Sequence, residues 1–176
     1  YNARTISKTV SMTPRGALKA LKKLEKAGFV SGKSFGRAIH YMINFTILTK
    51  MNLSLLLLEK AERNYKRWVE EFKDFTEADI LILFGSVLKG DKKHNDIDLI
   101  LVVEKKNYES LMKKIEEKND LLPKKIHPVI QTLNDLKDNL IKRNLVLLAA
   151  LKIGVVLKGQ KELVEVVENV SSRESR

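Results

Sequence analysis

The sequence contains no cysteine, which excludes a disulfide framework and a thiolate metal site. It also has no run of about 18 apolar residues that could span a membrane. The longest apolar stretch, residues 145–157, is interrupted by Lys152. No secretory signal pattern is present, so we expect a cytoplasmic protein. Its 176 residues, 44% of them apolar, are enough for a globular fold of one or two domains.

Acidic residues are nearly missing from the first 50 positions. This segment holds ten lysine and arginine residues and a single acid, Glu25, which gives a net charge of +9. The rest of the chain has 23 basic and 21 acidic side chains, so almost all of the total charge of +11 lies in residues 1–50. Such an asymmetry indicates a module that binds a polyanion, most simply DNA.

Two apolar segments in the second half of the chain frame its most informative motif. Residues 79–84 and 99–103 have the isoleucine, leucine and valine content of strands that are buried on both faces. Gly85 and Ser86 follow the first segment. Because glycine has no Cβ, backbone N–H groups beside it can approach a phosphate closely, and Ser86 adds a hydroxyl donor. We expect residues 87–89 to begin a helix whose N-terminal end favours anions.

Two aspartates precede the second apolar segment at a spacing of two. Residues i and i+2 of a strand point to the same face, so Asp96 and Asp98 present their carboxylates side by side, with Ile97 buried behind them. Mg²⁺ is commonly shared between one or two carboxylates and substrate phosphates. Two such ions can clamp the attacking and leaving oxygens of an in-line displacement. The motif therefore predicts a site for a nucleoside triphosphate (NTP) and Mg²⁺ or Mn²⁺. An acidic surface hairpin is the alternative.

The succession Gly85-Ser86, Gly90 and Asp96-Ile97-Asp98 resembles the signature of the nucleotidyltransferases related to DNA polymerase β, in particular the minimal nucleotidyltransferases of archaea and bacteria. The resemblance covers about residues 75–160. It implies a small mixed-sheet domain of the α/β (α+β) class. By this resemblance, Gly85 and Ser86 hold the β- and γ-phosphates, and Asp96 and Asp98 are catalytic metal ligands. Three nearby lysines could neutralise the triphosphate or simply be solvated: Lys89, Lys92 and Lys93.

The family's third carboxylate usually lies on a later neighbouring strand. The candidate strand, residues 125–130, contains no aspartate or glutamate, and His127 or a neighbour stands where the acid is expected. A histidine can ligate a metal, but it is a poor substitute at a hard Mg²⁺ site. An ordinary strand residue is the alternative. Because the third acid of the family helps to activate the attacking hydroxyl, we expect nucleotide and metal binding and leave turnover open.

The basic N-terminal segment has the pattern of a helix-turn-helix. Thr13 is a candidate N-cap with Pro14 at the first helical position, and Gly28 follows the predicted helix 14–27. Short extended pieces flank the glycine-containing basic loop 31–37. This order is similar to a winged helix-turn-helix with that loop as the wing. The first of the usual three helices is missing. Tyr1 is not a start methionine and begins in the middle of the pattern, so we expect the true N-terminus to precede it.

By that resemblance, the helix 14–27 enters the major groove of DNA. Residues near its start are expected to reach base edges: Thr13, Arg15 and Lys19. Others are expected to meet phosphates, which gives affinity without sequence information: Lys22, Lys33 and Arg37. The alternative is a basic, solvated helix in a dimerisation or substrate-docking module.

Residues 51–72 predict a long amphipathic helix between the two parts. Its apolar positions are Leu53, Leu56, Leu57, Ala61, Tyr65, Trp68, Val69 and Phe72. The leucine run 55–58 is expected to be buried on more than one side, either against its own domain or in the seam of a dimer. We thus predict a winged helix-turn-helix at 1–48, a linking helix at 49–75 and a nucleotidyltransferase-like domain at 76–176.

The alternation of helices and strands continues after the aspartates. We predict a helix over 108–119, a strand over 125–130, a helix from the Thr132 cap to about 144 that continues over 145–152, a strand over 155–157, a helix over 161–169 and a polar tail from 171.

These features predict Mg²⁺-dependent transfer of a nucleoside monophosphate from an NTP to an acceptor hydroxyl, coupled to a DNA-binding module. The alternative is a DNA-binding transcriptional regulator or an antitoxin-like protein whose nucleotide-binding transferase domain is catalytically impaired. The missing third acid favours this alternative. A helical protein partner or a homodimer is then expected, and no membrane partner.

Overall fold

The computed structural model describes residues 1–36, 38–89 and 96–174. The chain divides into two compact units, Tyr1–Asn52 and Leu53–Arg176. Buried side chains occur in both units, and each unit is described by itself. Within the described ranges, no helix combines the length and the hydropathy that crossing a membrane requires.

The first unit contains α1 (Ala3–Thr9), α2 (Pro14–Lys26), β1 (Val30–Phe35) and β2 (Ala38–Ile43), together with the first residues of the long helix that follows. Thr13 caps α2 as predicted, because its Oγ1 accepts a hydrogen bond from the Gly16 N–H at 3.1 Å and Pro14 follows it. Ala17 and Leu21 on the inner face of α2 are buried, as is Tyr41 on β2.

The predicted loop over 31–37 is wrong in its extent. Ser31 to Phe35 belong to β1 and pair with β2 in antiparallel register, from Ser31 opposite Met42 to Phe35 opposite Ala38. The positive φ of Gly36, +58°, permits the tight turn that makes this pairing possible. The start of the chain adds to the same sheet edge, because the Tyr41 N–H donates to the Tyr1 carbonyl at 2.7 Å.

The long helix α3 (Ile47–Glu71) begins before the predicted helix and has a kink at Tyr65, where φ is −136°. Ala61, Trp68 and Phe72 lie in or against the core of the second unit, as predicted. The leucine run is not buried on more than one side by its own domain, and the predicted alternative, the seam of a dimer, stays a prediction. Its four residues cover the whole circumference of the helix, whereas a helix turns only one stripe toward its core. Leu57 packs inward, while three side chains are 53%, 61% and 42% exposed: Leu55, Leu56 and Leu58.

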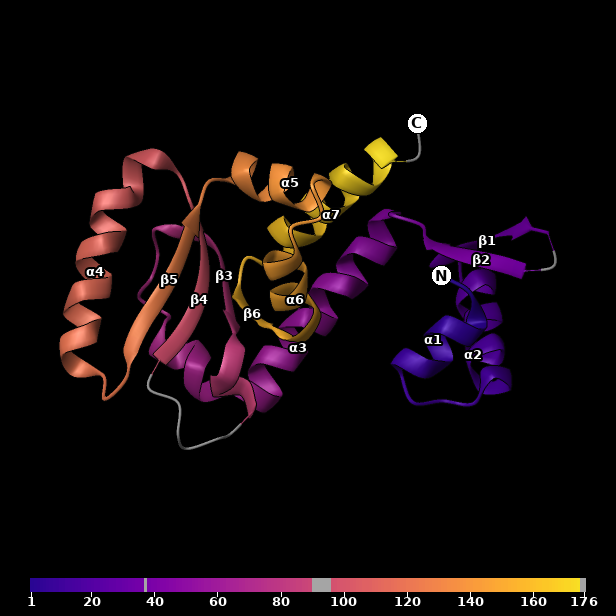
Figure 1. Cartoon of the computed structure of the whole chain (residues 1–176), viewed down its shortest axis with the longest axis horizontal. Helices are drawn as coiled ribbons and strands as arrows, with labels where there is room; N and C mark the ends of the chain where they lie inside the picture. The colour runs from indigo at the N-terminus through magenta and orange to yellow at the C-terminus, as the bar shows by residue number, and fades with distance from the viewer. Residues whose placement is uncertain (37, 90–95, 175–176) are drawn as a thin grey trace. The chain divides into compact units, whose positions relative to one another are not determined.

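A four-stranded mixed sheet with the order β5-β4-β3-β6 forms the centre of the second unit (Figure 1). Its strands are β3 (Ala78–Phe84), β4 (Asp96–Val103), β5 (Lys125–Gln131) and β6 (Val155–Lys158). β3 runs antiparallel to β4 and to β6, and β5 runs parallel to β4. The mixed sheet of the predicted fold class is thereby confirmed.

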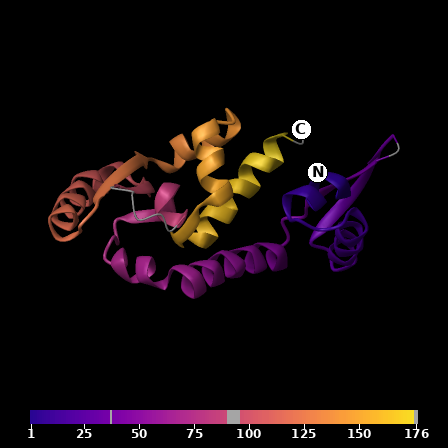
Figure 2. The same cartoon turned by 60° about the horizontal axis from the view of Figure 1, so that its bottom comes forward.

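Alternate side chains of β4 enter two separate cores. Ile97, Leu99 and Leu101 pack on the face covered by α3 and α4 (Tyr108–Leu121). Ile100 and Val102 pack on the face covered by α5 (Leu133–Ile141), α6 (Leu145–Ile153) and α7 (Gln160–Glu174). Figure 2 shows α3 on one side of the sheet and α6 and α7 on the other. The near-continuous apolar sequence of the strands follows from burial on both faces.

Two predictions for the C-terminal part are corrected. The helix predicted from the Thr132 cap through residue 152 is two helices, because Arg143 has a left-handed φ of +52° and the Asn144 side chain caps α6 by accepting from the Leu147 N–H. The tail predicted from residue 171 is helical as far as Glu174, since α7 continues through it.

Candidate metal and nucleotide site

Gly85 turns the chain at the end of β3. Its φ is +79°, a conformation that side chains with a Cβ rarely adopt. A short 3₁₀ segment follows, η1 (Gly85–Lys89), in place of the α-helix that we predicted to begin at residue 87. Val87 and Leu88 pack against the core shared with α3 and α4, which holds η1 against the sheet.

Asp98 lies directly against this turn. It pairs with Phe84 in the antiparallel register of β3 and β4, which brings it beside the residue that follows Phe84. A Cβ on Gly85 would lie 2.9 Å from the Asp98 Cγ and closer still to Oδ2. The backbone of the turn and the Asp98 carboxylate are therefore in immediate contact. Ser86, next in the chain, is half-buried.

Asp96 and Asp98 share the face of β4 that carries Ile100 and Val102, while Ile97 is buried on the opposite face. Ile100 and Val102 are covered by helices, but both aspartates are only half-buried at the beginning of the strand. The side chain of Asp96 is 45% exposed. The two carboxylates thus lie on one face of β4 next to the glycine turn, as predicted, and both are partly exposed to solvent.

His127 enters the same area from β5. It is the register partner of Asp98 in the parallel pair of β4 and β5, and its Nε2 lies 3.8 Å from Oδ1 of Asp96. The imidazole is 63% exposed. His127, predicted to stand where a third acid is expected, lies next to the first aspartate.

The model of the family described as "Polymerase beta, Nucleotidyltransferase" matches residues 66–162, which include β3, η1, β4, β5 and β6. The chain belongs to this nucleotidyltransferase family. Comparison with curated proteins gave no match, and neither did comparison with solved structures. The family assignment covers the glycine turn, both aspartates and His127.

A nucleotidyltransferase site needs oxygen ligands for a divalent ion, and this chain offers two carboxylates. Among the described residues, no group of three or more histidine, cysteine, aspartate or glutamate side chains is gathered closely enough to hold a metal without help. The donor set nonetheless fits Mg²⁺, because that ion often takes only one or two protein carboxylates and completes its shell with substrate phosphates and water.

Several of the predicted contact residues lie outside the described residues. These are Gly90, Lys92 and Lys93 of the motif, and Arg37 of the N-terminal unit. Lys89 ends η1, and its side chain is likewise outside the description.

One contact of the site region was missed by the sequence analysis. The Lys60 ammonium on α3 donates a hydrogen bond at 2.8 Å to the carbonyl of Gly154, immediately before β6. β6 begins with Val155 opposite Leu83, so this contact fixes the sheet edge two residues from Gly85. Lys60 and Gly154 are 94 positions apart, and no local pattern in the sequence links them.

The predicted DNA contacts of the first unit lie on an exposed surface. Ala17 and Leu21 form the buried face of α2. The side chains predicted to contact DNA are all exposed: Thr13, Arg15, Lys19 and Lys22 at or on α2, and Lys33 on β1. The Glu25 carboxylate is bonded within the unit, because its Oε1 accepts a hydrogen bond from the Gly32 N–H at 2.8 Å.

Proposed function

We propose that the protein transfers a nucleoside monophosphate from an NTP to an acceptor hydroxyl and releases pyrophosphate, with Mg²⁺ or Mn²⁺ as cofactor. The observation that carries this proposal is the direct contact between the Asp98 carboxylate and the Gly85 turn. It brings metal-binding oxygens and a phosphate-binding backbone segment to one point, within a chain of the nucleotidyltransferase family.

In this proposal, Asp96 and Asp98 hold the cation from one face of β4. The bound cation would supply positive charge to the phosphate oxygens of the NTP. Backbone N–H groups beside Gly85 and the hydroxyl of Ser86 bind the β- and γ-phosphates. The half-buried position of both aspartates leaves room on their open side for the nucleotide and the acceptor.

We further propose that residues 1–48 form a winged helix-turn-helix that binds DNA. Its support is the capped, basic helix α2 followed by the β1–β2 hairpin, together with the exposed cations on both. Thr13, Arg15 and Lys19 would reach base edges, and Lys22 and Lys33 would contact phosphates.

A second candidate function is a DNA-binding regulator or antitoxin-like protein whose transferase half binds nucleotide without turnover. The imidazole of His127 beside Asp96 favours it, because His127 cannot replace a carboxylate at a hard metal site. The exposed side chains Leu55, Leu56 and Leu58 would then offer an apolar contact to a helical partner or a second copy.

Two measurements on the same protein separate these candidates. Isothermal titration calorimetry with each NTP and Mg²⁺ or Mn²⁺ tests binding, and a labelled-NTP transfer assay tests turnover. Asp96→Asn and Asp98→Asn should each abolish metal-dependent NTP binding, whereas Asp120→Asn, an exposed aspartate on α4, should leave it unchanged.

Transfer of label supports the enzyme, and metal-dependent binding without transfer supports the regulator. If no NTP binds with either metal, or if the two site variants bind as well as the parent protein, both candidates are wrong.

A further inference from the structure

A cavity of about 490 Å³ lies at the opposite end of β4 from the two aspartates. It is lined by residues that follow β4, namely Lys105, Lys106 and Tyr108, and by residues at the end of β5 and beyond, namely Gln131, Thr132 and Asp135. Asp96 and Asp98 begin β4, whereas Val103 at the end of the same strand contributes to the cavity wall. At about 3.3 Å per strand residue, the two places are roughly 20 Å apart.

The topology of the sheet explains why a cavity opens at the carboxyl ends of β4 and β5. β4 and β5 are neighbouring parallel strands. After β4 the chain passes to α4, which covers one face of the sheet through Leu111 and Ile115. After β5 it passes to α5, which covers the opposite face through Leu136 and Leu140. Figure 1 shows the chain leaving the two strands in these different directions. The carboxyl ends of parallel strands whose connections diverge in this way are the usual position of ligand crevices in open α/β sheets.

Cations and carboxylates both line the cavity: Lys105 and Lys106 on one hand, Glu109 and Asp135 on the other. The carboxylate that pairs with Lys106, at 2.6 Å, is Glu104, which is not part of the lining. Asp135 is engaged already, because its Oδ2 accepts from the N–H and the hydroxyl of Thr132 at 2.9 and 2.6 Å. These hydrogen bonds, followed by the charge of Lys105, hold the pKa of Asp135 below its usual value. The Asp135 carboxylate therefore stays ionised as the cap of α5, and Lys105 and Lys106 are the groups of the lining that can bind an anion.

The remaining lining suits a ligand that is larger than a phosphate ion. Val103 and Ile130 provide apolar surface, and the Tyr108 ring is 46% exposed. The Glu109 carboxylate can accept hydrogen bonds from hydroxyl or amino groups. Gln131 is almost fully buried, and its Oε1 is held by the Asn139 amide at 3.1 Å. The volume lies within the range of about 300–1,000 Å³ that is typical of small-molecule sites.

We propose that this cavity binds a small phosphate monoester with hydroxyl or amino groups, such as a nucleoside monophosphate or a sugar phosphate, at a second ligand site separate from Asp96 and Asp98. The phosphate lies at Lys105 and Lys106, the donor groups face Glu109, and a planar ring, where the ligand has one, lies against Tyr108. This site does not depend on the transferase reaction, and the ligand is neither its NTP nor its metal.

The test uses the full chain with Asp96→Asn and Asp98→Asn, in EDTA, so that the first site takes no metal-bound nucleotide. AMP, ribose 5-phosphate and inorganic phosphate are titrated by calorimetry. We expect AMP to bind, and Lys105→Glu to weaken it at least tenfold. The matched control is Lys113→Glu, because Lys113 is an exposed lysine of α4 that does not line the cavity. This variant should bind AMP as the parent protein does. Tyr108→Ala should weaken AMP more than ribose 5-phosphate.

Three results would overturn the proposal. The first is absence of binding of AMP and ribose 5-phosphate at millimolar concentration. The second is equal weakening by the Lys105 and Lys113 variants, which would indicate general charge attraction. The third is equal affinity for inorganic phosphate and AMP, because the rest of the cavity would then contribute nothing. Circular dichroism of each variant shows that a loss of binding is not a loss of fold.

Discussion

Gly85 packs directly against the Asp98 side chain: a Cβ at position 85 would lie 2.9 Å from the Asp98 Cγ. Only glycine allows both the left-handed backbone of the turn and the inward position of this carboxylate. The spacing of the motif in the sequence therefore reflects one packed contact. In the proposed site, metal binding through Asp98 and phosphate binding at the turn would therefore not be altered independently.

Gly85→Ala should therefore remove metal-dependent NTP binding. The substitution strains a backbone with φ of +79°, which by itself costs about 1–3 kcal/mol, and it forces the Asp98 carboxylate or the η1 turn to move. Calorimetry with NTP and Mg²⁺ measures the effect. Gly28→Ala is the matched control, since Gly28 also has φ of +79° but has no atom within 4 Å of an added Cβ. NTP affinity in Gly85→Ala equal to that of the parent protein would contradict the proposed site.

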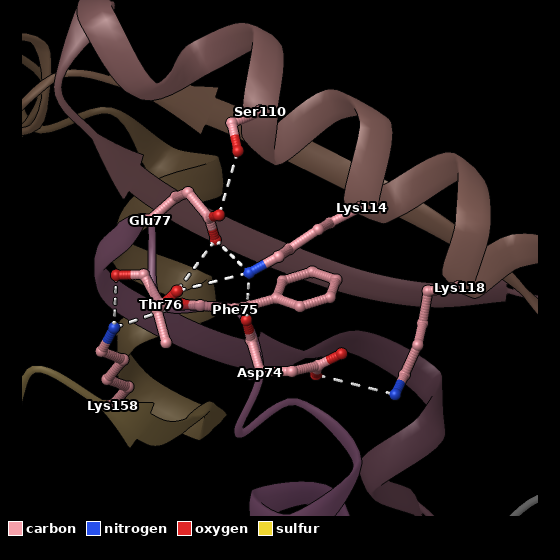
Figure 3. Close-up of polar contacts among 8 residues, drawn as sticks. All are labelled: Asp74, Phe75, Thr76, Glu77, Ser110, Lys114, Lys118 and Lys158. Carbon is pink, nitrogen blue, oxygen red and sulfur yellow. Dashed lines mark hydrogen bonds and ion pairs between the residues drawn. The ribbon is translucent and has the colours of Figure 1, made fainter.

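A second group of polar contacts, on the side of the unit away from the aspartates, ties α4 to the segment that precedes β3 (Figure 3). The Lys114 ammonium donates to Glu77 Oε2 at 2.8 Å and to the Asp74 carbonyl at 2.6 Å. The Ser110 hydroxyl donates to Glu77 Oε1 at 3.0 Å. Burial by itself would raise the pKa of Glu77, but the hydrogen bonds from Lys114, its own backbone and Ser110 lower it to about 2.

The stability of the second unit should therefore fall in strong acid. Because the folded-state pKa of Glu77 lies below the ordinary value of 4.5, its contribution is complete above about pH 4.5 and disappears as the pH falls toward 2. At neutral pH this contribution is at most about 3 kcal/mol. Urea unfolding should find Glu77→Gln less stable than the parent protein at pH 7, with a difference that shrinks below pH 4. A difference independent of pH would contradict the role of the charge.

DNA binding by the first unit should weaken steeply as salt rises. Lys22→Ala should weaken binding to all sequences alike and reduce the slope of log K against log salt by about 0.9, because one phosphate contact is lost. Arg15→Ala should instead relax specificity at one base pair, at a cost of about 1–3 kcal/mol. Lys161→Ala, an exposed lysine of the second unit, is the control. Fluorescence anisotropy over a salt series measures all three variants, and a flat salt response would contradict DNA binding.

The strands of the site were predictable because burial on both faces leaves a plain trace in the sequence. β3 and β4 consist mainly of isoleucine, leucine and valine, and Asp96 and Asp98 interrupt that pattern at the start of β4. The helix start at Thr13 was predictable for a similarly local reason, since the side chain bonds three residues ahead. In both cases neighbours in sequence decide the structure.

Features that depend on distant partners were not predictable. Four consecutive leucines do not reveal which one faces the core, and only Leu57 does so. The break at Arg143 lies in a sequence without glycine or proline, where the capping side chain of Asn144 starts a new helix. The cavity beyond β4 and β5 arises because α4 and α5 cover opposite faces of the sheet, which no short segment encodes.

His127→Asp should restore the third carboxylate of the family and thereby increase the affinity for Mg²⁺. The new carboxylate would stand on the strand next to β4, near Asp96, whose Oδ1 lies 3.8 Å from the present imidazole. Without metal, the added negative charge opposite two aspartates should destabilise the unit by about 0.2–1 kcal/mol. With Mg²⁺ and NTP, the loss should be reversed, because a third hard oxygen ligand joins the ion.

Thermal unfolding in EDTA and in Mg²⁺ with NTP measures both effects, and the labelled-NTP assay should show faster transfer. His127→Asn, which adds no charge, is the control. If Mg²⁺ with NTP raises the melting temperature of His127→Asp no more than that of His127→Asn, then His127 does not stand at the position of the third ligand.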